Sequence, residues 1–237
     1  MSVTLKGPGG LPVDLKRTRR KQTVGIAVED HRVQIFAPKW VPLREIQEII
    51  TKRSSWIGRQ IQLQAERPVI APKQFIDGEE HLYLGRAYVL RVVERPSPGV
   101  TLRAGKMIVA VPPAIGERCD ADAVRATLVD WYQSRAEDIL AETSARLAEK
   151  LGISPTRITV REYRSQWGSC SISGHIRYSW RIILAPWEVV EYVTAHELAH
   201  LRHHDHSSRF WRCVETLDSQ YRRHRDWLRT HGATLHL

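Results

Sequence analysis

The chain has 237 residues, 42% of them hydrophobic and 26% charged, which suits globular domains and excludes a disordered, collagenous or coiled-coil chain. Its 36 Lys and Arg exceed its 26 Asp and Glu, and the formal net charge of +10 favours contact with polyanions. No stretch approaches the roughly 18 apolar residues of a membrane span, and the N-terminus lacks the apolar segment of a signal peptide. With only three scattered cysteines, we expect a cytoplasmic protein with no membrane partner.

The first part of the chain predicts a hairpin followed by a helix. Short β-branched segments at residues 23–28 and 32–36 flank a polar turn, which indicates two paired strands. From Leu43 onward the apolar residues have the spacing of one helical face, and Pro68 interrupts that pattern. We therefore predict a helix that begins near Leu43 and ends before Pro68.

A second cycle of the same kind follows. Residues 81–93 and 100–111 predict strands, and residues 120–150 predict a long helix. The two cycles align at a constant offset of 75 residues, which matches Pro38 with Pro113. We interpret them as an internal repeat of two strands and a helix. The alternative is that this order of elements is common and the match is chance.

The last part of the chain combines short strands with three helices. Residues 157–164 and 175–184 alternate like half-buried strands, and the turn-rich segment 165–174 connects them. The predicted helices cover residues 186–202, 208–217 and 220–230. No long linker separates the parts. We therefore expect one compact α+β body, with an N-terminal β-rich lobe at 1–116 and a second region at 117–237.

The first of these three helices contains an HExxH sequence at His196, Glu197 and His200. Residues four apart lie on one helical face about a turn apart, so two imidazoles can bind one zinc ion. Glu197 can reach water at the metal and is suited to act as general base and then as proton donor. Val189 and Val193 extend the same face, so the imidazoles point inward, where a metal satisfies them. The alternative is two core histidines bonded to the backbone.

A zinc site that keeps an open position needs a third protein ligand. The candidates are His203, His204, His206 and Glu215. If the helix continues, His203 lies about 10.5 Å along its axis from His196, which is too far for a shared ion. His206 follows a short polar turn that can fold the chain back. We predict His206 as the third ligand, with Glu215 from the next helix as the alternative.

Three segments carry a resemblance to a known family: YRSQWGSCS at 163–171, SWR at 179–181 and HELAHLRHHDHSSRFW at 196–211. They resemble the YgjP-like zinc metallopeptidase family, which is similar to SprT-like and WLM proteases around the zinc helix. The resemblance extends over roughly residues 19–232. Gln166 and Tyr178 depart from the family pattern, where other polar residues, often Arg and Asn, are expected. The substrate pocket is therefore not carried over.

The resemblance implies a zincin-like metallopeptidase core in which His196, His200 and His206 bind Zn²⁺ and Glu197 is catalytic. We accordingly predict an α+β zinc metallopeptidase that hydrolyses peptide bonds in a protein or peptide substrate. Water attacks the peptide carbonyl while Glu197 takes its proton, and Glu197 then delivers the proton to the leaving amine.

Several residues near these motifs are candidates for substrate binding. Trp167, with Gly168 and Ser169, could shape the substrate groove, and Cys170 could approach the metal. We favour the structural alternative, in which Trp167 fills the core and Cys170 is a small buried hydrophobe. We expect the strand at 175–181 to be an edge strand, which makes it a candidate for peptide binding by strand addition. The candidate donors to an oxyanion are Tyr178, Arg181, His175 and His204.

Basic residues support a second hypothesis of a different class. Residues 16–21 place five basic side chains in six positions, and the last predicted helix combines four arginines with Tyr221 and Trp227. Basic and aromatic residues together are typical of nucleic-acid surfaces, although a solvated face has the same composition. The alternative function is a nucleic-acid-associated protein whose zinc site is structural or latent, with Cys170 or His204 as fourth ligand. A third reading, by similarity to SprT-like proteins, is a protease recruited to protein–nucleic-acid complexes.

Overall fold

The structure is a computed structural model. It describes residues 5–18, 23–29, 32–65, 72–113, 120–163 and 166–237. The end of the basic run at 19–21, the predicted turn at 30–31 and Cys119 lie outside the described residues. Contacts divide the chain into two compact units, Met1–Ile70 and Ala71–Leu237. Among the helices in the described ranges, none has the length and apolar character needed to cross a bilayer.

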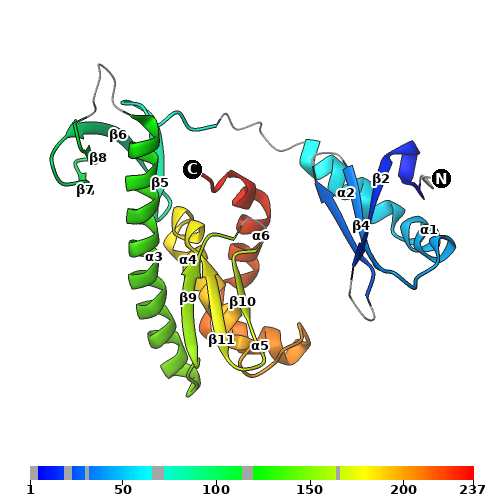
Figure 1. Ribbon diagram of the computed structural model, residues 1–237. Coiled ribbons are helices and arrows are strands. Elements are labelled where there is room, and N and C mark those ends of the chain that lie inside the picture. Colours follow the sequence, from blue (N-terminus) through cyan, green and yellow to red (C-terminus); the bar gives the residue numbers. More distant parts are fainter. Residues whose placement is uncertain (1–4, 19–22, 30–31, 66–71, 114–119, 164–165) are drawn as a thin grey trace. The chain divides into compact units, whose positions relative to one another are not determined.

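The first unit is a four-stranded sheet with helices packed on it (Figure 1). Its strands in spatial order are β1 (Leu5–Lys6), β2 (Pro12–Thr18), β4 (Arg32–Pro38) and β3 (Gly25–Glu29). β2 runs parallel to β4, and β3 runs antiparallel to it. The sequence analysis predicts no strand before residue 23, because β2 carries charged residues at three of its seven positions.

The helix predicted after residue 43 is two helices. α1 (Leu43–Lys52) ends at Arg53, whose backbone angles (φ −101°, ψ 8°) leave the helical region, and α2 (Ser54–Ala65) follows directly. Their apolar residues nevertheless enter one core with the sheet. That core contains Val33, Ile35, Ile46, Ile50 and Ile57.

The second unit begins with a sheet of the same topology. Its strands in spatial order are β5 (Glu80–Tyr83), β6 (Arg86–Glu94), β8 (Lys106–Val111) and β7 (Gly99–Arg103). β6 runs parallel to β8 and β7 runs antiparallel to it, as β2 and β3 do with β4 in the first unit. In both units a helix follows the sheet. The internal repeat predicted from the offset of 75 residues is therefore present in the strand order and directions.

A single long helix joins the two sheets of the second unit. α3 (Ala121–Leu151) begins at Asp120, whose side chain accepts a hydrogen bond from the N–H of Asp122 at 2.9 Å. It ends at Gly152, which adopts the left-handed conformation (φ 59°) of a helix C-terminus. Figure 1 shows α3 with β7 and β8 beside one end and with β9 (Arg157–Arg161) and α4 (Trp187–Ala199) beside the rest.

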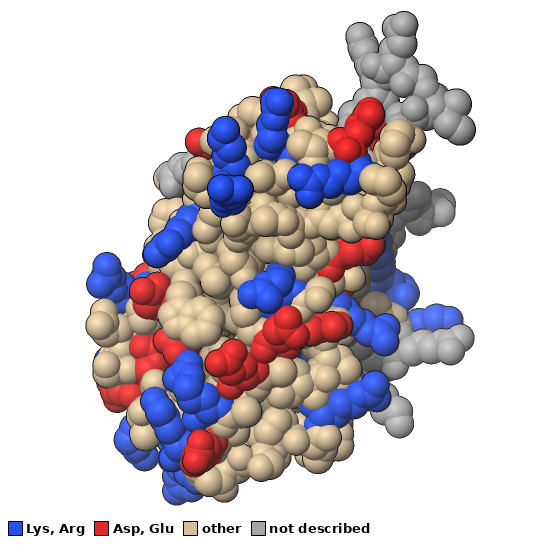
Figure 2. Space-filling view, turned by 90° about the vertical axis from the view of Figure 1, so that its left-hand side faces the viewer, with Lys and Arg blue, Asp and Glu red and all other residues tan. Residues whose placement is uncertain are grey.

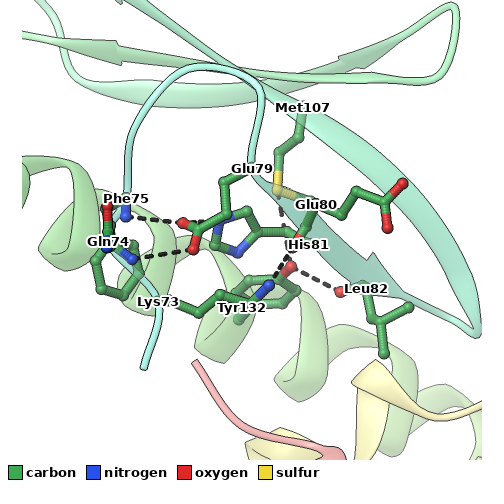
Figure 3. A network of polar contacts seen from close by, with 9 residues as sticks. All are labelled: Lys73, Gln74, Phe75, Glu79, Glu80, His81, Leu82, Met107 and Tyr132. Atoms are coloured by element: carbon green, nitrogen blue, oxygen red, sulfur yellow. Dashed lines mark hydrogen bonds and ion pairs between the residues drawn. The ribbon is translucent and has the colours of Figure 1, made fainter. Parts of the chain in front are cut away.

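A buried polar network ties the sheet to α3 (Figure 3). The hydroxyl of Tyr132 on α3 donates to the carbonyl of Leu82 on β5 at 2.7 Å. Next to it, the Glu79 carboxylate accepts the N–H of Phe75 at 2.8 Å and lies 3.3 Å from the ring of buried His81. The sequence predicts one body with a boundary at residue 116. The observed division instead falls after Ile70. The contact of Tyr132 with Leu82 joins the four-stranded sheet of β5, β6, β8 and β7 to α3 within one unit.

The second sheet of this unit has three strands and lies next to the last helices. Its spatial order is β10 (Gly168–Cys170), β11 (His175–Ser179) and β9. β11 is central, so it has no free edge for the peptide addition expected at 175–181; β10 lies at the edge instead. Residues expected to extend this strand form a 3₁₀ helix, η2 (Trp180–Leu184). The remaining elements are η1 (Pro8–Gly10), α5 (Ser208–Leu217), α6 (Tyr221–His231) and η3 (Gly232–Thr234).

Candidate metal centre

Helix α4 carries the HExxH sequence and buries most of its side chains. Val189 and Val193 are buried, as the apolar spacing predicts. His196 lies in the last turn, and His200 follows at the C-cap with right-handed helical angles (φ −66°, ψ −18°). The two imidazoles therefore lie one turn apart on the same side of the helix, with ring centroids 5.0 Å apart.

The third histidine reaches this pair because the helix ends directly after His200. The N–H groups of Leu201 and Arg202 donate to carbonyls three residues earlier, which tightens and closes the last turn. The chain then turns, and Nε2 of His206 lies 3.2 Å from Nε2 of His196. One nitrogen from each of His196, His200 and His206 lies within 4.8 Å of the other two. This is the only such cluster of possible metal ligands within the described ranges.

The other candidate ligands have different partners. Glu215 accepts a hydrogen bond from Arg222 at 3.0 Å, outside the cluster. The carbonyl of His203 accepts the Nδ1–H of His200 at 3.0 Å, which leaves Nε2 of His200 free to face the cluster. Cys170 and His204 do not belong to the cluster either.

Two of the three histidines, His196 and His200, have lowered pKa values, which favours the neutral form that binds metals. Burial, together with the neighbouring His200, His206 and Arg225, lowers the pKa of His196 to about 3. Burial also lowers the pKa of His200. Metal ligation requires deprotonated imidazole nitrogens, so the lowered pKa values of His196 and His200 favour binding of a cation. Three converging imidazole nitrogens are a donor set that fits zinc.

Glu197 lies beside this cluster, with 5% of its surface exposed. Burial raises the pKa of its carboxyl to about 8. Its Oε2 atom is buried and has no hydrogen-bond partner among the described residues, a costly state that a bound cation or water at the site relieves. A nearby divalent cation also favours the ionised carboxylate.

The backbone of β10 passes directly over Glu197. A methyl group at Gly168 would lie 2.6 Å from both Cγ and Oε1 of Glu197, which is closer than non-bonded atoms approach. Only a residue without Cβ therefore allows this approach. From the sequence Gly168 is expected only as part of a turn that could shape the substrate groove; its contact with Glu197 joins distant segments and leaves no local pattern.

Aromatic rings support the histidines from α5. Phe210 is fully buried, and its ring centroid lies 4.9, 4.5 and 4.8 Å from those of His196, His200 and His206. Trp211 lies next to them, with its centroid 5.8 Å from that of His196 and 5.7 Å from that of His206. These contacts pack α5 on the histidine helix and hold the imidazole rings in place.

The predicted substrate residues lie in less suitable positions. Tyr178 is fully buried, and its hydroxyl lies 3.2 Å from Oγ of Ser144 on α3. Arg181 is used in an ion pair with Glu162. Trp167 is half-buried in the core around Gly232 at the end of α6.

Cys170 matches its structural interpretation. The residue is partly buried and packs against the main core of the second unit. Burial, with the charge of Glu197, raises the pKa of its thiol to about 11. A thiol with so high a pKa is mostly protonated at neutral pH and is a poor nucleophile and metal ligand.

Comparison with known proteins gives the class of this site. Residues 22–231 match the family model described as YgjP-like, metallopeptidase domain. The molecule is therefore a metal-dependent peptidase by class. More narrowly, the chain belongs to the YgjP-like metallopeptidase family, as the sequence resemblance predicts.

A solved structure also matches part of the chain. It is the crystal structure of the metallopeptidase zymogen of Pyrococcus abyssi abylysin, with 25% sequence identity and a TM-score of 0.36. The match covers 38% of this chain and 92% of that one. No curated protein matches the sequence.

Proposed function

We propose that this chain hydrolyses peptide bonds with a zinc ion held by His196, His200 and His206 and with Glu197 as the general base. The observation that carries the proposal is the convergence of three imidazoles beside a buried carboxylate oxygen that has no hydrogen-bond partner among the described residues. Bound zinc supplies Lewis-acid chemistry, which makes water acidic enough to act as a nucleophile near neutral pH.

The residues of the chain then move one proton. Oε2 of Glu197 accepts the proton of the attacking water and later gives it to the nitrogen of the leaving amine. Burial makes this carboxylate more basic, which suits a group that must both take and return a proton near pH 7. Gly168 and β10 hold Glu197 in place, and the carbonyl of His203 orients His200.

The described donor set supports a catalytic rather than a structural site. Structural zinc sites are normally closed by four protein ligands, whereas catalytic sites use three and keep one position open. Neither Cys170 nor His204, the residues considered as a fourth ligand, joins the three histidines in the cluster.

Peptide hydrolysis by the purified chain tests the proposal. We expect zinc-loaded protein to cleave an unstructured protein such as reduced casein. Chelation should abolish the cleavage, and added zinc should restore it. Mass spectrometry of the products would locate new termini at peptide bonds. Cleavage that survives complete removal of the metal, or no cleavage by fully loaded protein, would contradict the proposal.

A nucleic-acid partner is a second candidate, and one observation favours it. Residues 1–70 contain 13 Lys and Arg against 6 Asp and Glu, a net charge of +7 out of the +10 of the whole chain. Trp40 in this unit is 65% exposed and follows Lys39. By contrast, Lys/Arg and Asp/Glu are intermixed on the face drawn in Figure 2. An exposed aromatic ring within a basic unit suits the stacking of single-stranded bases.

Salt-dependent binding tests this second candidate. We expect the full chain to bind a labelled single-stranded oligonucleotide, with an affinity that falls steeply as salt rises. Trp40→Ala should weaken binding by about tenfold, since stacking contributes roughly 1–3 kcal/mol per base. Trp187→Ala removes a partly exposed indole (37% against 65% for Trp40) from the second unit and serves as the control. Absence of binding at low salt would exclude this function.

A further inference from the structure

Arg225 lies near the histidine cluster and stacks on the ring of Trp211. The guanidinium of Arg225 on α6 lies 4.6 Å from the ring centroid of Trp211. Trp211 is the same indole that lies next to His196 and His206. Stacking on an aromatic face orients the plane of a guanidinium and leaves its N–H edge open to a ligand.

Arg225 differs from the other three arginines of α6 in having no polar partner. Arg222 bonds to Glu215, Arg223 to Gln220 and Arg229 to Asp226. Arg225 is exposed, and no hydrogen bond or ion pair of its guanidinium is found within the described ranges.

Arg222 makes the comparison close, because it stacks in the same way. Its guanidinium lies 4.7 Å from the ring centroid of Tyr221, and its charge is neutralised by Glu215. Arg222 and Arg225 thus lie three residues apart on one helix, and each stacks on an aromatic ring. Arg222 has a carboxylate partner, whereas none is found for Arg225 among the described residues.

The positive charge of Arg225 reaches the metal site. Its guanidinium stacks on Trp211, whose ring centroid lies 5.8 Å from that of His196 and 5.7 Å from that of His206. A fixed cation next to a site for a divalent cation repels the metal and is unfavourable in itself. An anionic group bound between the two would offset this repulsion.

We propose that Arg225 binds a carboxylate of the peptide substrate, so that the chain favours peptides with an acidic group close to the scissile bond. This inference rests on the proposed peptidase function. A guanidinium and a carboxylate form two parallel hydrogen bonds, which fix orientation as well as charge. The carboxylate belongs either to an Asp or Glu side chain or to the C-terminus of the peptide.

Two pairs of peptides separate these sources. The first pair differs in Glu against Gln near the cleaved bond, and the second differs in a free against an amidated C-terminus. For the zinc-loaded chain we expect kcat/KM to favour the acidic member of one pair by about tenfold, as for other charge-assisted hydrogen bonds. Arg225→Gln should abolish the preference, Arg225→Lys should keep part of it, and Arg222→Gln should leave it unchanged.

Binding provides a readout that does not depend on turnover. Calorimetry with the zinc-loaded Glu197→Gln protein should show the same preference in Kd, and its loss on adding Arg225→Gln. Preference in the Glu/Gln pair identifies a side-chain carboxylate, and preference in the other pair identifies the C-terminus. The proposal is overturned if neither pair discriminates, or if Arg222→Gln and Arg225→Gln act alike. Carboxylate-dependent binding without any hydrolysis would keep the Arg225 site and refute the peptidase function.

Discussion

Glu197→Gln is expected to retain the metal and to lose peptidase activity by about 10²–10⁴-fold, the usual contribution of a general acid–base group. Glutamine has nearly the same shape, so the histidine cluster keeps its geometry. Its amide cannot accept the proton of water, so general-base catalysis is lost and kcat falls. The measurement is steady-state hydrolysis of one peptide, with metal content determined on the same preparation.

Glu215→Gln is the matched control for this prediction. Glu215 was the alternative third ligand, and it lies in an ion pair with Arg222. We expect this variant to retain both metal and activity. Full activity of Glu197→Gln would refute the role of Glu197, and activity loss in Glu215→Gln with loss of metal would restore the alternative ligand.

Gly168→Ala is expected to lower kcat by about 100-fold, which is the cost of displacing a reacting group by about 1 Å. The added methyl group would lie 2.6 Å from Cγ and from Oε1 of Glu197, so either the carboxylate or β10 must move. Because the three histidines come from other segments, the metal should remain bound. Peptide kinetics and metal content on the same sample measure both effects.

Gly99→Ala controls for the substitution itself. Gly99 belongs to the same unit, and a methyl group there meets no atom within 4 Å. We expect this variant to behave like wild type. A thermal melt of each variant separates local displacement from unfolding. Wild-type kcat in a folded Gly168→Ala protein would show that the close approach of β10 does not position Glu197.

The sequence identified the part of the site that depends on local spacing. His196 and His200 share a helical face because they are four residues apart, and His206 follows a turn that permits a return. Gly168 and Arg225 become important only through contacts with distant segments, Glu197 in one case and Trp211 in the other. Neither contact leaves a periodic pattern in the sequence.

The same limit explains the errors in the fold. The alternating apolar residues of β11 suit an edge strand and a central one equally well, so the strand was expected at an edge although it is central. Tyr178 was a candidate oxyanion donor, although its side chain is fully buried. The boundary at 116 followed a change in local pattern. The real division depends on the packing of α3 against both sheets of the second unit, through residues such as Tyr132. The repeat was detectable because its elements recur in order.

Metal content is the most direct test of the three-histidine site. Mass spectrometry should be applied to purified wild type, His206→Ala and His204→Ala after identical exposure to zinc. His204 is exposed, lies two residues from His206 and does not belong to the cluster, so its variant is the matched control. We predict about one zinc per chain in wild type and His204→Ala and almost none in His206→Ala, because two imidazoles bind zinc far more weakly than three. Zinc retained in His206→Ala, or no zinc in the wild type, would contradict the account.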